Sequence, residues 1–119
     1  MPNNMPNHMP NHIYKGTRND DSDAGLIVTR DDLFFSPVPS QQLFNHSPDG
    51  FEWGYNGSGP AQLALALLLD VSRDPGSSVA YHQEFKRQFV SGWGEEWSIS
   101  STEISTWLVN LAKWPVPKK

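Results

Sequence analysis

The residues with the clearest potential for chemistry form a glycine-rich segment, Gly-Tyr-Asn-Gly-Ser-Gly, at positions 54–59. This segment stands directly before an uncharged apolar stretch that predicts a helix starting at Pro60. A glycine turn that leads into a helix exposes backbone N–H groups at the positive helix end, and such groups hold phosphates or carboxylates. The candidate binding residues are the loop and its nearest neighbours: Glu52, Trp53, Gly54, Tyr55, Gly57, Ser58, Gly59 and Gln62.

The same loop also fits a purely structural role, which we favour. It contains no lysine, and its glycines match neither Gly-x-Gly-x-x-Gly nor Gly-x-x-x-x-Gly-Lys-Ser/Thr. Pro60 lacks an N–H group, while glycines serve wherever a turn needs positive φ or the backbone approaches an aromatic ring. The anion-binding hypothesis therefore requires a cleft at residues 54–59 into which Glu52, Tyr55 and Gln62 point.

The other polar residues form no catalytic set, and we predict no catalytic residue, no metal site and no cofactor. Gln62 is the one polar residue in the first nine positions of an otherwise apolar helix, so if it is buried it must find hydrogen-bond partners. We favour the backbone of the loop as that partner, and a ligand is the alternative. We interpret His46 as a solvated loop residue and His82 as packing at the boundary of a helix. The absence of cysteine excludes thiol nucleophiles, disulfides and thiolate zinc sites.

Composition and charge narrow the class of partner. The 119 residues suit one ordinary domain, and the net charge is −4 with nine scattered Lys and Arg residues. Proteins that hold nucleic acid by its phosphates show a basic patch, so direct binding of DNA or RNA is not expected. No apolar run reaches the roughly 18 residues of a membrane span, and no signal peptide is visible. We therefore predict no membrane contact and a cytoplasmic location.

The chain is predicted to consist of a leader, one domain and a tail. Residues 1–12 repeat the pattern Met-Pro-Asn-Asn/His and carry no side chains able to build a core, so we expect them to be disordered. Translation is compatible with a start at Met1, Met5 or Met9. Residues 13–115 form the single α+β domain, and residues 116–119 form the tail.

The predicted fold class is α+β, with a small antiparallel sheet of two to three short strands packed on a bundle of three helices. We expect strands at residues 12–18 and 25–30, paired as a hairpin, and a further short strand at residues 51–53. Residues 36–40 are expected to be extended, because two prolines disfavour a helix there. The three helices are expected from Pro60 to near Ser72, from Ser77 or Ser78 to around Gly92, and from Ser100, with a capping box to Glu103, to Pro115.

Five tryptophans are many for a chain of this length. Trp93 and Trp97 flank the connection at residues 94–96 and are our candidate interface residues, because exposed aromatic side chains around loops are typical of protein interfaces. The alternative is that tryptophans close a small core from several sides. We expect that structural role for at least three of the five.

A longer motif carries a family resemblance. The run NHSPDGFEWGYNGSGPAQLALALLL at residues 45–69 resembles the signature of a family of small uncharacterised proteins, a domain of unknown function found in bacteria, phages and plasmids. The similarity extends over about residues 12–114. Asn56 stands where much of that family has glycine, and asparagine tolerates positive φ better than other non-glycine residues. The resemblance implies no established activity.

From these observations we predict a non-enzymatic protein-interaction module with an unidentified protein partner. The resemblance further implies an accessory protein of a mobile element, acting on a host system such as defence. The alternative is a small-molecule, anion or nucleotide binder, with or without enzymatic activity, that uses the loop at residues 54–59. The sequence does not predict an oligomeric state.

Overall fold

The computed structural model describes residues 11–19 and 25–113. The predictions for residues 1–10 and 114–119, which cover most of the leader and the whole tail, lie outside the described residues. Asn11 and His12 belong to the described part and contact the start of the last helix. The Thr102 hydroxyl donates to Asn11 Oδ1 at 2.9 Å, and the His12 N–H donates to Ser101 Oγ at 2.8 Å. These two leader residues therefore take part in the fold.

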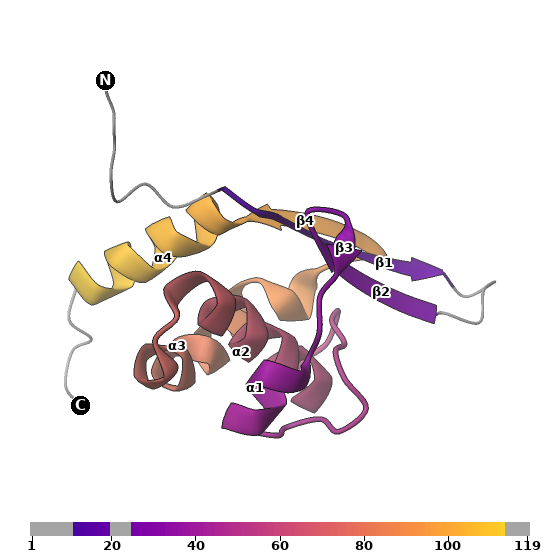
Figure 1. Cartoon of the computed structure of the whole chain (residues 1–119), viewed down its shortest axis with the longest axis horizontal. Helices are drawn as coiled ribbons and strands as arrows, with labels where there is room; N and C mark the ends of the chain where they lie inside the picture. Colours follow the sequence, from indigo (N-terminus) through magenta and orange to yellow (C-terminus); the bar gives the residue numbers. More distant parts are fainter. Residues whose placement is uncertain (1–10, 20–24, 114–119) are drawn as a thin grey trace.

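The structure confirms an α+β fold, in which one antiparallel sheet has helices gathered on one side (Figure 1). The sheet has the strand order β3-β2-β1-β4. Its strands are β1 (Ile13–Asn19), β2 (Gly25–Arg30), β3 (Leu33–Phe34) and β4 (Glu96–Ser100). The helices are α1 (Val38–Leu43), α2 (Ser58–Ser72), α3 (Pro75–Gln88) and α4 (Ser101–Lys113), with a short 3-10 helix at Val90–Gly92.

Strand β1 lies at the centre of the sheet, between β2 and β4. Alternate residues of β1 face the helices, and Tyr14 is fully buried among them. Gly16 stands opposite Val28 on β2 and Trp97 on β4, and the Trp97 indole lies directly over it. The hairpin of β1 and β2 confirms the prediction from the sequence, while β4 comes from a segment about 80 residues further along the chain.

Helix α2 is the centre of the core, as its uncharged residues 61–69 predict. Residues 59–68 are all buried, and the core residues around this helix include Tyr14, Trp53, Phe85 and Ile104. The helix ends at Arg73, a left-handed C-cap whose N–H donates to the Leu69 carbonyl at 2.8 Å. No helix in the described part of the chain is both long enough and apolar enough to cross a membrane.

The prediction that residues 36–40 are extended is wrong, because α1 begins at Val38. Proline is tolerated in the first turn of a helix, where N–H groups have no intrahelical partner. Pro37 is the N-cap, and Pro39 falls within the first turn. The first amide that must bond back along the helix is that of Gln41, which donates to the Pro37 carbonyl at 3.0 Å.

The strands are also distributed differently from the prediction. Residues 51–53 form no strand; instead the Gly54 N–H donates to the Val90 carbonyl at 3.0 Å and the Trp53 indole donates to the Gly94 carbonyl at 2.7 Å. Strand β4 was not expected, although Trp97 and Ile99 alternate with exposed residues as in a half-buried strand. The described fold therefore has four strands and four α-helices rather than two to three strands and three helices.

The starts of α3 and α4 follow from capping residues. Helix α3 begins at Pro75, earlier than predicted, because Asp74 caps it by accepting from the Gly76 N–H at 3.1 Å. For α4 the predicted capping box is confirmed. The Ser100 N–H donates to Glu103 Oε1 at 2.9 Å, and the Glu103 N–H donates to Ser100 Oγ at 3.0 Å.

Candidate functional site

Gln62 is fully buried, and the protein satisfies its whole amide group. Its Oε1 accepts from the N–H groups of His46 and Ser47 at 2.7 and 2.9 Å. Its Nε2 donates to Ser40 Oγ at 3.0 Å and to the Phe44 carbonyl at 3.1 Å. The side chain therefore fixes residues 44–47 to α2, and its hydrogen-bonding capacity is used up within the fold.

Each glycine of the loop occupies a position where a side chain would be strained or would clash with a neighbour. Gly54 has a φ of +89°, which disfavours any side chain. A Cβ on Gly57 would lie 2.5 Å from the Tyr55 ring, and a Cβ on Gly59 would lie 2.5 Å from Glu52 Cβ. These positions match the structural role that we favoured from the sequence: a turn with positive φ and close approach to an aromatic ring.

The start of α2 is not arranged around an anion. Its N-cap is Gly57, no side chain caps it, and Ser58 is an exposed first residue. The side chain packed closest against Gly59 is the carboxylate-bearing Glu52. A negative charge at this position opposes a phosphate or carboxylate ligand, although the free N–H groups would favour one.

A shallow hollow of about 350 Å³ opens at the beginning of the loop rather than along it. Arg18 donates to Glu52 Oε1 at 3.0 Å and to the Trp53 carbonyl at 3.2 Å, and its guanidinium lies 5.1 Å from the centre of the Trp53 ring. Burial opposes ionisation of Glu52, but Arg18 and the Trp53 N–H outweigh it and hold the pKa of this carboxyl below its ordinary value. The lining residues are Arg18, Glu52, Trp53, Gly54, Tyr55, Trp93, Gly94 and Glu95.

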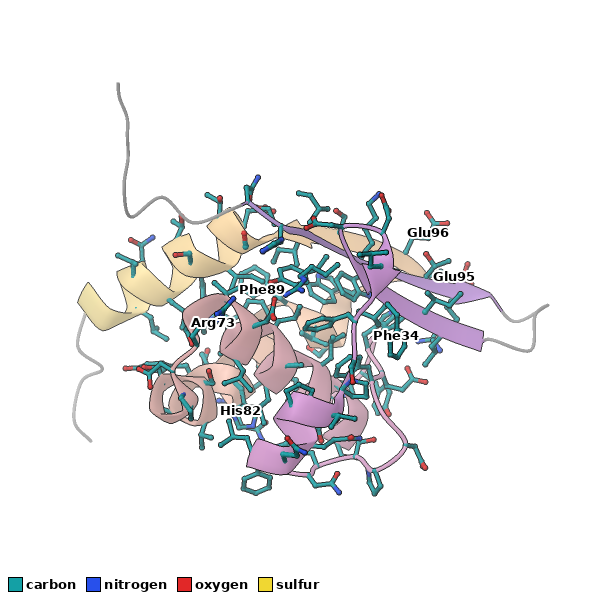
Figure 2. The ribbon with its side chains drawn as sticks, in the orientation of Figure 1. Phe34, Arg73, His82, Phe89, Glu95 and Glu96 are labelled. Atoms are coloured by element: carbon teal, nitrogen blue, oxygen red, sulfur yellow. The ribbon has the colours of Figure 1, made fainter. Side chains whose placement is uncertain are left out.

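Four of the eight candidate binding residues therefore line this hollow, and four do not. Glu52, Trp53, Gly54 and Tyr55 line it, whereas Gly57, Ser58, Gly59 and Gln62 lie elsewhere. Of the three residues that the anion-binding hypothesis places in one cleft, Glu52 and Tyr55 line this hollow and Gln62 does not. Figure 2 shows that this end of the molecule, marked by Glu95 and Glu96, lies far from Arg73 and His82.

The four tryptophans in the described part of the chain close the core, as expected for at least three of the five, and Trp114 lies outside the described residues. Trp53 and Trp97 are buried, and Trp93 and Trp107 are half-buried against the same core. The Trp93 and Trp97 rings stack with their centres 4.1 Å apart, and the Trp53 ring meets Trp97 edge-on at 5.6 Å. Of the two candidate interface residues, only Trp93 retains a substantial exposed surface, since Trp97 is 7% exposed.

The described residues hold no group of three or more His, Asp or Glu side chains placed to bind a metal ion. They do contain a partly buried polar cluster that the sequence did not predict. The Tyr14 hydroxyl donates to Asp70 Oδ2 at 2.5 Å, and Arg30 Nη1 donates to both carboxylate oxygens at 2.8 and 2.9 Å. Burial and the Asp70 carboxylate raise the pKa of the Tyr14 hydroxyl far above its ordinary value of 10. The available signal was Asp70 itself, a charged residue at the end of an apolar helix that must find a partner.

A second pair that the sequence did not predict joins His46 to His82. Their Nε2 atoms lie 2.9 Å apart, and His82 Nδ1 lies 2.8 Å from the Val79 carbonyl. The Val79 carbonyl can only accept a hydrogen bond, so the proton of neutral His82 is on Nδ1. His82 Nε2 is then the acceptor, and His46 Nε2 is the donor. This hydrogen bond exists only while His82 is neutral, and it links residues 44–47 to α3.

We therefore expect the protein to lose stability as the pH falls below about 6.5. Burial, the main cause for both residues, lowers the pKa of His46 and of His82, and the neighbouring Lys86 lowers both further. The unfolded chain then binds protons at a higher pH than the folded chain, so the stabilisation is complete above 6.5 and decreases below it. Urea unfolding at pH 7.5 and pH 5.5 measures the difference, and His82→Gln should reduce it. Equal or greater stability at pH 5.5 would contradict this assignment.

Of the eight large apolar side chains that are exposed in the described part of the chain, four lie on residues 33–44, which we name the β3–α1 segment. Figure 1 shows it leaving the edge of the sheet at β3 and running to α1. Leu33 and Phe34 are 73% and 78% exposed, and Val38 and Phe44 are about half exposed. In the sequence these residues resemble core residues, so only the structure reveals them as surface.

A hollow lies on each side of this segment. One, of about 330 Å³, is lined by Phe34, Pro37, Asp49 and Phe51 together with Leu26, Val28, Phe35 and Gly50. The other, of about 320 Å³, is lined by Phe35, Ser36, Pro39 and Ser40 on one side and by Ala66, Leu69, Asp70 and Arg73 of α2 and its C-cap on the other. The β3–α1 segment therefore forms an apolar ridge between two depressions.

Comparison with known proteins gives a family but no activity. The model of a family of unknown function, DUF6166, matches residues 14–110. Neither the curated proteins nor the solved structures include a match to the chain.

Proposed function

Because the chain belongs to the DUF6166 family of unknown function, which brings no activity with it, we propose a function from the structure. The protein is a non-enzymatic protein-interaction module that binds a partner protein on the β3–α1 segment. The observation that carries this proposal is the exposure of Leu33 and Phe34, at 73% and 78%, on an edge strand.

Exposed apolar side chains on a sheet edge are a liability that folded proteins ordinarily avoid. Edge strands usually carry charges or prolines, or are covered, because an open apolar edge promotes aggregation. Single exposed apolar residues are normal, but a group of them marks an interaction surface. Leu33, Phe34, Val38 and Phe44 lie along 12 residues of chain, and the hollow beside Phe34 and Pro37 can receive a side chain of a partner.

The charges around this segment indicate what the partner carries. Asp32 is exposed and only loosely paired with Lys15, with 3.6 Å between charged atoms, and Asp49 lines the adjoining hollow. These carboxylates complement a basic rim, and the chain as a whole has a net charge of −4. We therefore assign the surface to a partner segment with apolar anchor residues flanked by Lys or Arg.

The interior of the molecule supports a binding module over an enzyme. The carboxylate of Glu52 already accepts hydrogen bonds from Arg18 and from the Trp53 N–H, and Gln62 is fully used by the fold. The resemblance of residues 45–69 to proteins of bacteria, phages and plasmids supports a finer proposal: the module is an accessory protein of a mobile element, and its partner belongs to a host system such as defence.

A pull-down with two variants tests this function. Tagged full-length protein is used as bait in native lysate, beside Leu33→Ser/Phe34→Ser and a matched control, Val109→Ser. Val109 is an apolar residue on α4 and is 56% exposed, so Val109→Ser also replaces an exposed apolar side chain by serine. We expect at least tenfold less partner on the double variant and unchanged recovery on the control, with melting temperatures that stay close to that of the parent.

The proposal fails if no protein depends on Leu33 and Phe34 for its recovery. It also fails if sedimentation shows that the bait itself dimerises through these two residues, because the surface would then belong to a second copy of the chain.

A further inference from the structure

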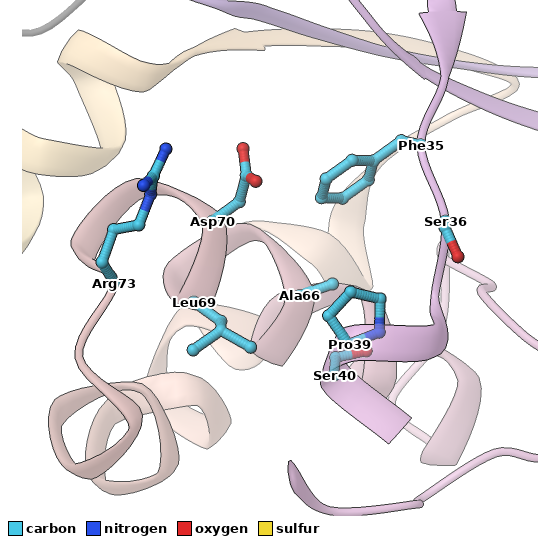
Figure 3. A pocket seen from close by; sticks show the side chains of 8 residues that line it. All are labelled: Phe35, Ser36, Pro39, Ser40, Ala66, Leu69, Asp70 and Arg73. Atoms are coloured by element: carbon cyan, nitrogen blue, oxygen red, sulfur yellow. The ribbon is translucent and has the colours of Figure 1, made fainter. Parts of the chain in front are cut away.

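The hollow between the β3–α1 segment and α2 combines an apolar lining with two charged side chains. Figure 3 shows Phe35 and Pro39 on one side of it and Leu69, Asp70 and Arg73 on the other. Its floor and walls are largely apolar, and its volume of about 320 Å³ lies at the lower end of the range for small-molecule sites. It therefore has room for a compact ligand with an apolar body.

The charges at this cavity do not cancel. The Asp70 carboxylate is paired with Arg30, which donates to both of its oxygens, and it also accepts from the Tyr14 hydroxyl. Arg73 lines the same cavity, and no acidic side chain in the described part of the chain forms an ion pair with it. With Asp70 neutralised by Arg30, the charge left at the cavity is the positive charge of Arg73.

The hydroxyl groups of the cavity are already engaged by the protein. Ser40 Oγ donates to the Pro37 carbonyl and accepts from Gln62, and Ser36 Oγ accepts from the Val38 N–H. Arg73 thus remains the charged side chain with donors to spare. A cation is also favourable at the C-terminal end of a helix, which accounts for a basic residue at this position but not for an apolar cavity beside it.

From this arrangement we propose that the cavity binds a small organic anion, a carboxylate attached to an apolar body about the size of one aromatic ring. The guanidinium of Arg73 binds the carboxylate, as Arg does in paired, charge-assisted hydrogen bonds. The apolar body packs between Phe35, Pro39 and Leu69. This site shares the β3–α1 segment with the proposed protein contact, but it uses Phe35 and Pro39 rather than Leu33 and Phe34.

Three probes of one shape and different charge test the site. Phenylacetate, phenylacetamide and phenethylamine are titrated into the labelled full-length protein while its backbone amide signals are followed by NMR. We expect phenylacetate to shift the signals of Phe35, Ser36, Leu69 and Arg73 in a saturable way, and to bind at least fivefold more tightly than the amide. The cationic amine should bind more weakly than both.

Two variants separate the site from unspecific effects. Arg73→Gln, on an exposed residue, should abolish the preference for the acid over the amide. The control Arg87→Gln, at an exposed position of α3, should keep the preference for the acid. The proposal is overturned if phenylacetate gives no saturable shift, if acid and amide bind equally, or if Arg73→Gln leaves the preference intact. None of these results depends on whether the β3–α1 segment binds a protein.

Discussion

Replacing Gly16 by alanine should destabilise the protein by about 3 kcal/mol or more, at the upper end of the range for overpacked cores. An added Cβ would lie no farther than 2.6 Å from three atoms of the Trp97 indole. The indole has little room to move, because Trp93 stacks on it and Trp53 meets its edge. The strain would therefore spread to β1, the central strand. Thermal unfolding should show a melting temperature lower by 10 °C or more.

Gly92→Ala is the matched control for this change. A Cβ at Gly92 would meet nothing within 4 Å, and the residue has no positive φ. Its stability should stay within about 0.5 kcal/mol of the parent. If Gly16→Ala were equally harmless, the close packing of Trp97 on β1 would be refuted.

Gln62→Leu should cost about 3 kcal/mol, even though the new side chain is apolar and similar in size. The change removes four hydrogen bonds, each worth about 1 kcal/mol. The Ser47 N–H loses its partner, and the His46 N–H keeps only the Phe44 carbonyl, at 3.2 Å. The loop at residues 44–47 should then open locally. Hydrogen exchange of the His46 and Ser47 amides should accelerate more than that of the α2 amides.

Gln42→Leu provides the comparison, because Gln42 is an exposed glutamine on α1. It should leave both the stability and the exchange of His46 nearly unchanged. If Gln62→Leu unfolds no more easily than Gln42→Leu, then the amide of Gln62 does not hold the loop.

The sequence predicts well the parts of this fold that local chemistry decides. Three such features involve only residues close together in the chain: the hairpin of β1 and β2, the uncharged residues 61–69 of α2, and the capping box of Ser100 and Glu103. Gln62 was predicted because a lone polar residue in an apolar helix must be hydrogen bonded somewhere. In each case the residues that interact lie within about 20 positions of one another in the sequence.

The missed features depend on contacts between distant residues or on a rule applied too strictly. Strand β4 pairs with β1 across about 80 residues, so its alternation of Trp97 and Ile99 looked like a connection. Helix α1 was missed because proline was taken to exclude a helix, although it is tolerated in the first turn.

The candidate site shows the same limit. Glu52 and Tyr55 were found by sequence, but Arg18, Trp93 and Glu95 reach the same hollow from other elements. The pairs His46–His82 and Tyr14–Asp70 join residues 36 and 56 positions apart. Leu33 and Phe34 carry no local sign of exposure, because apolar residues beside a strand are ordinarily buried.

The most direct test of the proposed function places a photoreactive benzophenone side chain at position 34 of the otherwise unchanged protein and, separately, at position 109. Both positions are exposed and apolar, on β3 and α4 respectively. Irradiation in native lysate should give one discrete adduct with a partner protein from position 34 and none from position 109. No adduct from position 34, or the same adduct from both positions, would contradict the assignment of the β3–α1 segment as the partner-binding surface.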